Sequence, residues 1–354
     1  MALYNNFRPV VFEDVVGQEP VVMSIVGGLR TERFSHAYLL SGPRGTGKTT
    51  VARLIAMYLN CIGTGLKPCG TCEVCVAIQN GNYSDVIEVN AASSRGIDSI
   101  RSLKDSALFA PVSGKYKVFI IDEVHGLTTE ASNAVLKVLE EPPSFVVFVL
   151  ATTEENKVLA TIKSRCQIQR FLPVPVALIL NRLEYVCEVQ HLTIPKNTLS
   201  LIAEEARGSI RDALSLLDLV VNLENNEVAE VRNILGRIEY ELIGDFVDCL
   251  IERDAAKALK FVNDLYEERR YLEGFAQEVT AWLMSLLRLK AGADYFTHPM
   301  LERMREQVLS FQMADLVLCI EKFLEREKVV IIPQLGLELA ICEICDSMSP
   351  VDDF

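Results

Sequence analysis

A glycine-rich stretch at residues 42–49, with the sequence GPRGTGKT, has the residue types and spacing that bind the phosphates of a nucleotide. The glycines let the backbone curl so that successive N–H groups point at phosphate oxygens. Lys48 would reach the β- and γ-phosphates, and the Thr49 hydroxyl would ligate Mg²⁺. The nucleotide-binding residues predicted in this stretch are Gly42, Gly45, Gly47, Lys48, Thr49 and Thr50.

Two adjacent carboxylates, Asp122 and Glu123, follow the largely apolar run at residues 117–121. Such a run is typical of a central parallel strand covered on both faces, and ligands bind at the C-terminal ends of these strands. We expect Asp122 to hold the Mg²⁺ shell and Glu123 to polarise the attacking water as general base. An acidic pair could also be a simple turn, but the upstream glycine-rich stretch favours the catalytic interpretation.

Four cysteines, Cys61, Cys69, Cys72 and Cys75, lie within 15 residues. Two interlocking C-x-x-C spacings plus one more thiolate form the ligand set of a tetrahedral structural Zn²⁺. The alternative is four unrelated buried thiols, but the spacing favours zinc. Because protein would fill all four positions, the metal would be structural rather than catalytic.

Five further residues are candidates whose alternatives stay open on residue types alone. Ser94 and Arg95, at the expected start of a helix, could hold a DNA phosphate or could be a helix cap and a solvated arginine. Thr152 follows an apolar run, where its hydroxyl could orient water or the γ-phosphate. Arg165 could be a surface residue or a finger that reaches the nucleotide of a neighbouring subunit. Arg211 lies in a first helical turn, where the helix dipole disfavours a cation, which hints at a function.

Alternating strands and helices must position these residues. Apolar runs predict strands at residues 37–40, 85–89, 117–123 and 145–151, and helical periodicity appears between them. This pattern indicates an α/β P-loop domain with a parallel sheet. From residue 177 onward the pattern is helical only.

Two prolines in the segment 171–176 indicate a domain boundary. We expect a nucleotide-binding domain at residues 1–172 with the cysteine insertion at 61–75, a small helical lid domain at 173–237 and an all-α collar domain at 238–354. Cys342 and Cys345 in the last domain are expected to be core thiols.

Composition limits the class of protein. The 354 residues are 50% hydrophobic and 23% charged, which is ordinary for a globular protein, and the net charge of −13 argues against charge-driven nucleic-acid binding by the whole chain. A local basic face is still compatible with this charge. We find no secretory signal and no apolar run near the ~20 residues that span a bilayer, so we expect a cytoplasmic protein without a disulfide framework.

Taken together, these motifs resemble the AAA+ ATPases and, within them, the gamma/tau family of bacterial DNA polymerase III clamp-loader subunits. The resemblance spans essentially the whole chain. Its most specific marks are FRP at 7–9, VGQ at 16–18, the four-cysteine insertion, DEVH at 122–125, LEEPP at 139–143, ATT at 151–153, SRC at 164–166 and GSIRDA at 208–213.

The resemblance implies roles for particular residues. The stretch around Arg8 and Val16 would contact the adenine base, and Thr152 and Arg211 would be the sensors that touch the γ-phosphate. Arg165 would be an arginine finger acting in trans. The resemblance also strengthens the case for DNA-backbone contacts near Ser94 and Arg95.

It further implies an activity and partners. ATP would hold a spiral of subunits that opens the sliding clamp on primer–template DNA, and hydrolysis would release the clamp. The partners would be the delta and delta-prime subunits, further copies of this chain, the clamp and DNA, with no membrane. Since the chain stops at Phe354, we expect a gamma-like core without the longer tau tail. Two alternatives are another P-loop DNA motor or remodelling ATPase, such as a helicase, and a scaffold that binds nucleotide without hydrolysing it.

Overall fold

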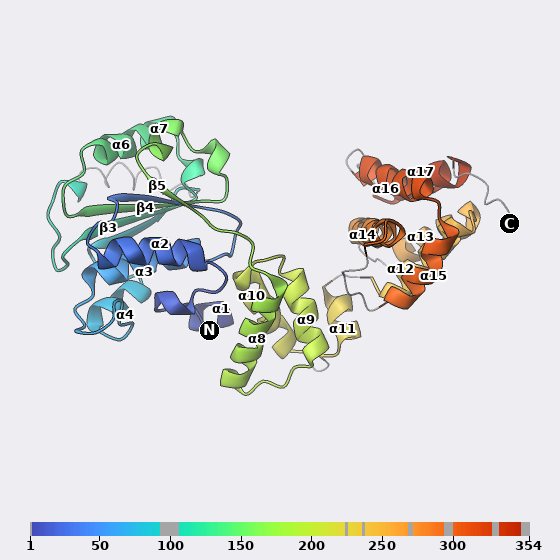
Figure 1. Ribbon diagram of the computed structural model, residues 1–354, viewed down its shortest axis with the longest axis horizontal. Coiled ribbons are helices and arrows are strands. Elements are labelled where there is room, and N and C mark those ends of the chain that lie inside the picture. The colour runs from blue at the N-terminus through green and yellow to red at the C-terminus, as the bar shows by residue number, and fades with distance from the viewer. Residues whose placement is uncertain are drawn as a thin grey trace. The chain divides into compact units, whose positions relative to one another are not determined.

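A parallel sheet forms the centre of the N-terminal part of the chain (Figure 1). The computed structural model describes residues 2–92, 106–223, 226–235, 238–267, 272–293, 300–327 and 333–347. Within these residues the strands are β1 (Ala37–Ser41), β2 (Val86–Asn90), β3 (Lys117–Asp122), β4 (Val146–Thr152) and β5 (Gln167–Arg170). Their order is β2-β3-β4-β1-β5 and all neighbours run parallel, which confirms the predicted α/β sheet.

Helices cover both faces of this sheet (Figure 1). Helices α2 (Glu19–Arg30) and α3 (Lys48–Asn60) pack on one face, and α6 (Thr129–Glu140) and α7 (Ala160–Lys163) pack on the other. Short 3-10 turns η2 (Val124–Gly126) and η3 (Glu155–Lys157) follow β3 and β4.

Strand β3 shows why the apolar runs in the sequence are continuous. Val118 and Ile120 join the core cluster on the α3 side, whereas Phe119 and Ile121 join the cluster on the α6 side, and all four are fully buried. Because successive strand residues point to opposite faces, a sheet covered on both sides needs an apolar residue at every position. Burial of each such side chain contributes roughly 1.5–3 kcal/mol.

The first segment of the chain, residues 2–18, forms an N-terminal arm. It contains only two short elements, α1 (Leu3–Asn6) and η1 (Phe12–Asp14), as its proline and short length predict. The Gln18 side chain donates to the Leu172 carbonyl and accepts from the Leu172 N–H at 2.7 and 3.2 Å. The arm is therefore held against the segment that leaves the sheet.

Three helices, α8 (Val176–Gln190), α9 (Lys196–Glu205) and α10 (Ile210–Val221), follow the sheet and pack on one another. Helix α10 begins after the N-cap residue Ser209, whose hydroxyl accepts the Asp212 N–H at 3.1 Å. The chain forms two compact units, residues 1–226 and 227–354, and the finer boundaries at 172 and 237 stay a prediction.

The second unit consists of helices only in its described residues. They are α11 (Val228–Ile234), α12 (Tyr240–Ile251), α13 (Ala255–Glu267), α14 (Leu272–Lys290), α15 (Leu301–Ser310), α16 (Met313–Glu327) and α17 (Pro333–Ser347). The expectation that Cys342 is a core thiol is wrong, because it is exposed on α17, while Cys345 is half-buried. None of the described helices is long and apolar enough to cross a membrane.

Two elements of the first unit lack a signal in the sequence pattern. Helix α4 (Glu73–Gln79) lies inside the cysteine insertion, where cysteines and glycines obscure its periodicity. Strand β5 is an edge strand with alternating polar residues, so it lacks the apolar run of the central strands.

A buried carboxylate fixes the loop before β3. Asp85 is fully buried and accepts the N–H groups of Val112, Ser113 and Gly114 at 2.7–2.8 Å. Burial raises the pKa of Asp85, but these three donors and Lys117 together outweigh burial, so the net pKa lies below its ordinary value.

Asp85→Asn should destabilise the first unit by about 2–4 kcal/mol, because an amide removes the charge and cannot satisfy all three donors. A carboxylate with a lowered pKa contributes its stability above the unfolded pKa, and that contribution fades as the pH falls through the lower folded value. The deficit should therefore be largest above about pH 4. Urea unfolding followed by circular dichroism measures it, while the single tryptophan, Trp282, reports the second unit.

The exposed Glu188→Gln is the matched carboxylate-to-amide control and should change stability by less than about 0.5 kcal/mol. Equal stability of Asp85→Asn and the wild type would contradict the role given to Asp85.

Candidate functional site

The glycine-rich loop lies between β1 and α3, as the sequence predicts. Gly42, Gly45 and Gly47 have φ angles of 144°, 74° and 104°, which side chains rarely adopt. Gly42 and Gly45 also need their small size: a Cβ on Gly42 would lie 2.3 Å from the Phe171 carbonyl oxygen, and one on Gly45 would lie 1.9 Å from Ser209 Oγ. The loop can therefore adopt this curl, and accept its neighbours, only with glycine at these positions.

Lys48 and Thr49 begin helix α3 and point into the loop. Lys48 is buried, and its Nζ donates to the carbonyl oxygens of Gly42 and Pro43 at 2.8 and 2.7 Å. Burial lowers the pKa of Lys48, and the nearby carboxylates of Glu123 and Asp122 oppose that shift. Thr49 Oγ1 donates to Asp122 Oδ2 at 2.8 Å. A hydroxyl and a carboxylate oxygen, which are both ligand types that Mg²⁺ prefers, therefore lie side by side.

Glu123 adopts a left-handed backbone conformation, with φ 53°, just after β3. Its Oε2 accepts the Thr153 hydroxyl at 3.0 Å and the Thr153 N–H at 3.3 Å, and lies 3.4 Å from His125 Nδ1. The same His125 nitrogen lies 3.0 Å from Thr152 Oγ1. The sequence alone gave no role to Thr153 or His125. Their position in the sequence, beside Thr152 and residues 122–123, was the signal that could have identified them.

A cavity of about 310 Å³ opens in front of these residues. It is lined by the loop, by Asp122 and Glu123, and by the predicted Arg8, Val16 and Arg211. The lining residues that were not among the predicted site residues are Tyr4, Phe7, Pro9, Asp14, Val15, Arg44, Thr46, Asn90, Arg182, Ile210 and Leu214. Most of them come from the arm and from α8 and α10, whose proximity to the loop depends on tertiary packing.

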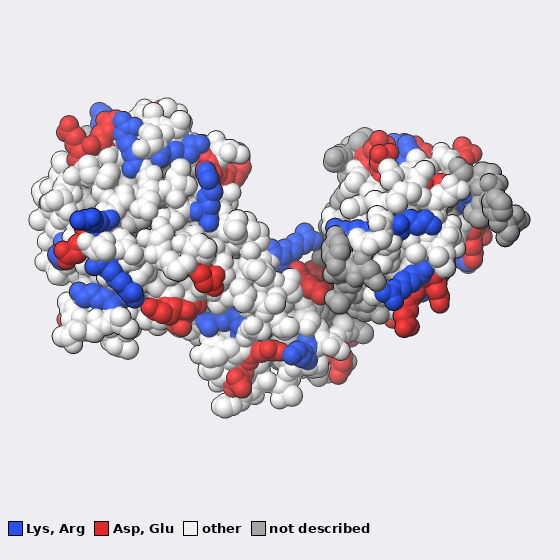
Figure 2. Space-filling view, viewed as in Figure 1, with Lys and Arg blue, Asp and Glu red and all other residues white. Residues whose placement is uncertain are grey.

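The arm and helices α8 and α10 close the cavity together. The Arg211 guanidinium stacks 5.0 Å from the Tyr4 ring centre, and Arg182 donates to the Phe7 carbonyl at 2.9 Å. Burial lowers the pKa of Arg8, with a further lowering from nearby Arg53. Basic and acidic side chains are interspersed on the visible surface of this unit (Figure 2), whereas the cavity gathers several cations, as a polyphosphate requires.

Thr152 and Arg165 do not line this cavity. Thr152 is fully buried at the end of β4, and its hydroxyl contacts His125 and accepts the Glu154 N–H at 3.0 Å. Arg165 follows α7 and pairs with Glu140 at 2.7 Å, its side chain 33% exposed. Ser94 and Arg95 lie outside the described residues.

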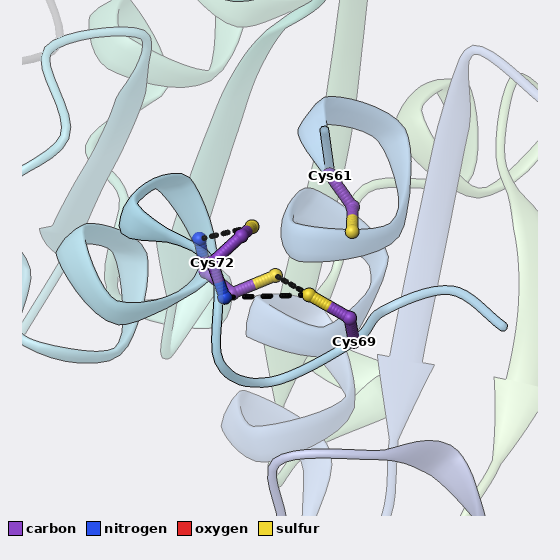
Figure 3. Close-up of side chains that lie close together, drawn as sticks. Cys61, Cys69 and Cys72 are labelled. Atoms are coloured by element: carbon purple, nitrogen blue, oxygen red, sulfur yellow. Dashed lines mark hydrogen bonds between the residues drawn. The ribbon is translucent and has the colours of Figure 1, made fainter. Parts of the chain in front are cut away.

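The four cysteines of the insertion converge on one point. Their Sγ atoms all lie within 4.8 Å of one another, close to the ~3.8 Å that separates sulfurs around a tetrahedral zinc with Zn–S bonds of ~2.3 Å. Figure 3 shows Cys61, Cys69 and Cys72 pointing toward the shared space from the end of α3, the following turn and the start of α4. The donor set and its geometry fit a structural zinc.

Backbone N–H groups support these sulfurs. Cys72 N–H donates to Cys69 Sγ at 3.3 Å, Cys75 N–H to Cys72 Sγ at 3.4 Å, and Gly63 N–H to Cys61 Sγ at 3.4 Å. Hydrogen bonds from the backbone at Thr71 and Cys72 lower the pKa of Cys69 to about 6. All ten cysteines of the chain are free thiols in the structure.

Comparison with known proteins gives two matching family models. The model described as "DNA polymerase III, delta subunit" matches residues 17–175, and the one described as "DNA polymerase III clamp loader subunit, ATPase lid domain" matches residues 178–223. The second match covers α8, α9 and α10, which we call the lid.

Curated relatives match over most of the chain. DNA polymerase III subunit gamma of Buchnera aphidicola is 39% identical over 74% of this chain and 74% of that protein. DNA polymerase III subunit tau of Bacillus subtilis is 36% identical over 98% of this chain and 63% of that protein. The tau subunit of Escherichia coli is 40% identical over 74% of this chain and 41% of that protein. The chain thus spans less than two thirds of the length of these tau relatives.

Gly45→Ala should weaken Mg-nucleotide binding at least about tenfold, equivalent to ~1.4 kcal/mol, because the new Cβ is strained at φ 74° and displaces Ser209 from the loop. Titration of a fluorescent ATP analogue measures the affinity. Gly27→Ala, in α2, is the matched control, since nothing lies within 4 Å of its added Cβ, and it should bind like the wild type. Unchanged binding by Gly45→Ala would mean that the contact with the lid is dispensable.

Proposed function

The chain belongs to the gamma/tau family of bacterial DNA polymerase III clamp-loader subunits, and from this membership we propose that it is an ATPase subunit of a replicative clamp loader. The observation that carries the proposal is the meeting of Thr49, Asp122 and Glu123 at one edge of a cavity that the arm and lid close. We propose that it acts in the cytoplasm, binds ATP and Mg²⁺ in this cavity, and couples hydrolysis to placing a sliding clamp on primer–template DNA.

Several lining residues have a part in this activity. The loop N–H groups and Lys48 bind the phosphates, and Lys48 exchanges the Gly42 and Pro43 carbonyls for phosphate oxygens. Thr49 and Asp122 hold Mg²⁺, which supplies charge neutralisation on the phosphates. Arg8 and Val16 border the adenine.

Hydrolysis uses Glu123 as the base. The water oxygen bonds to the γ-phosphorus while the bond from phosphorus to the bridging oxygen of ADP breaks, and the water proton passes to the Glu123 carboxylate. Thr153 and His125 both contact Oε2, which leaves Oε1 to accept the proton of the water in this proposal. Arg211, and Thr152 acting through this network, sense the γ-phosphate.

Arg165 does not line the cavity of its own chain, which favours a role in trans. In an assembly, it would reach the nucleotide of the adjacent subunit and stabilise charge on the transferring phosphoryl group. We propose that the partners are the delta and delta-prime subunits and further copies of this chain. Ser94 and Arg95 remain the predicted contacts to the DNA backbone.

The cysteine insertion is proposed to hold a structural Zn²⁺. Cys61, Cys69, Cys72 and Cys75 would supply all four ligands and leave no open position for substrate. The helical second unit is proposed to be the collar that joins subunits.

Glu123→Gln should keep ATP affinity within about twofold and lower kcat by roughly 10²–10⁴-fold, because an amide cannot accept the proton of water. Steady-state phosphate release and analogue titration measure the two quantities. The exposed Glu141→Gln is the carboxylate-to-amide control and should turn over like the wild type. Full turnover by Glu123→Gln would remove the assignment of the base.

Arg165→Ala should abolish the stimulation of ATP hydrolysis by clamp plus primed DNA in a complex with delta and delta-prime, since arginine fingers contribute about 10³-fold or more. The ATP affinity of the isolated chain should be unchanged because Arg165 does not line its cavity. Arg30→Ala, an exposed arginine that ends α2, should retain the stimulation. A rate that ignores clamp and primed DNA even in the wild type would favour a general P-loop motor or remodelling ATPase.

A further inference from the structure

The cysteine module (residues 61–79) adjoins the nucleotide cavity through two routes. One route is helix α3: Lys48 begins it at the cavity, and Cys61 is its C-cap. The other is the N-terminal arm, which passes over the turn between Cys69 and Cys72. The second route links the module to residues that line the cavity without passing through the core of the sheet.

The contact on this route is between Gly70 and Val10. Gly70 has φ 74°, and a Cβ added to it would lie 3.3 Å from Val10 Cγ2 and 3.6 Å from the Val10 carbonyl oxygen. The arm therefore rests directly on the turn that holds two of the four cysteines. The Gln79 side chain, at the end of α4, donates to the Gly70 carbonyl at 3.0 Å and fixes the same turn from inside the module.

Val10 is two positions from Arg8 and next to Pro9, and both of these line the cavity. On its other side, Phe12 is buried and its ring lies 6.5 Å from the Tyr58 ring of α3. The lid holds the arm at a different place, through the bond from Arg182 to the Phe7 carbonyl. Arg8 and Pro9 thus lie between one support from the lid and one from the module.

A second set of contacts joins the module to the surroundings of Arg8. Arg53 donates to the Gln79 carbonyl at 3.4 Å and forms a two-point ion pair with Glu88 at 2.8 and 3.0 Å. The charges of Arg53 and Glu88 both act on the Arg8 guanidinium. A shift of the end of α4 would therefore change the field at Arg8 as well as the position of the arm.

We propose that the cysteine module positions the N-terminal arm through the contact between Gly70 and Val10, and thereby sets the affinity of the cavity for ATP. The inference rests on the proposed function, since it concerns the nucleotide site. When the four cysteines hold a metal, the turn at Gly70 is ordered, and this turn supports Val10. Val10 in turn fixes where Arg8 and Pro9 meet the nucleotide. Val10 is a positioning residue here and binds neither the metal nor the nucleotide.

The test is a binding cycle on the full chain. Affinity for a fluorescent ATP analogue with Mg²⁺ is measured for the wild type and Val10→Ala, each with bound zinc and after removal of zinc by a chelator with low affinity for Mg²⁺. Metal content is measured in each sample, and circular dichroism checks that the sheet stays folded. Val10→Ala leaves all four cysteines and the turn intact, so it reports on the contact even if zinc removal loosens the module.

Zinc removal should weaken the wild type by ~5–10-fold, whereas zinc-loaded Val10→Ala should already be weakened to a similar degree and lose less than about twofold more. Leu66→Ala is the matched control, because this side chain lies in the module, is 77% exposed and has no role in supporting the arm; it should follow the wild type in both states.

Three outcomes overturn the inference. In the first, wild-type affinity is unchanged when zinc is verifiably removed. In the second, zinc removal weakens Val10→Ala as much as the wild type. In the third, the chain binds no zinc. Failure of the zinc-loaded wild type to bind the analogue at all would instead overturn the proposed function, so the two failures are distinguishable.

Discussion

Close approach at two glycines is the constraint on which the site depends. Gly42 admits the Phe171 carbonyl, and Gly45 admits Ser209 at the start of α10, at distances where any Cβ would collide. The loop thus contacts both the end of the sheet and the start of α10 in the lid. A shift of α10 reaches the phosphate-binding backbone directly, so the lid and the loop are expected to move as one body around the nucleotide.

The lid and the arm also explain how an acidic chain binds an anion. The net charge of −13 is spread over two units, while the cavity brings Arg8, Lys48, Arg182 and Arg211 together from four parts of the sequence. Local geometry rather than composition sets the potential that a ligand meets. Arg211 accepts an unfavourable position in the first turn of α10, because there it lies over the Tyr4 ring and borders the cavity.

Sequence patterns predicted the central strands, the phosphate-binding loop and the cysteine cluster, because each depends on local rules: continuous apolar runs, glycine spacing and ligand spacing. They missed contacts between distant segments. The bond from Arg182 to Phe7 joins residues 175 positions apart, and periodicity carries no information about it. They gave no role to Thr153, whose hydroxyl donates to Glu123, because an apolar run does not show which hydroxyl after it meets that carboxylate; the role of Thr152 stays a prediction. Cys342 was misplaced because an apolar helix in a sequence does not reveal which of its faces a neighbour covers.

The candidate catalytic groups already have partners within the chain. Lys48 bonds to loop carbonyls, Thr49 to Asp122, Glu123 to Thr153, and Arg165 to Glu140. Partly buried polar groups are costly when unpaired, so these bonds keep the site ordered and each must be exchanged rather than simply gained when substrate or a neighbour binds. The exchanges differ in which molecule supplies the new partner. In the proposed function, nucleotide and Mg²⁺ would replace the partners of Lys48 and Thr49, and the nucleotide of an adjacent subunit would replace Glu140 as the partner of Arg165. The proposal therefore makes nucleotide binding a property of one chain and rapid hydrolysis a property of the assembly.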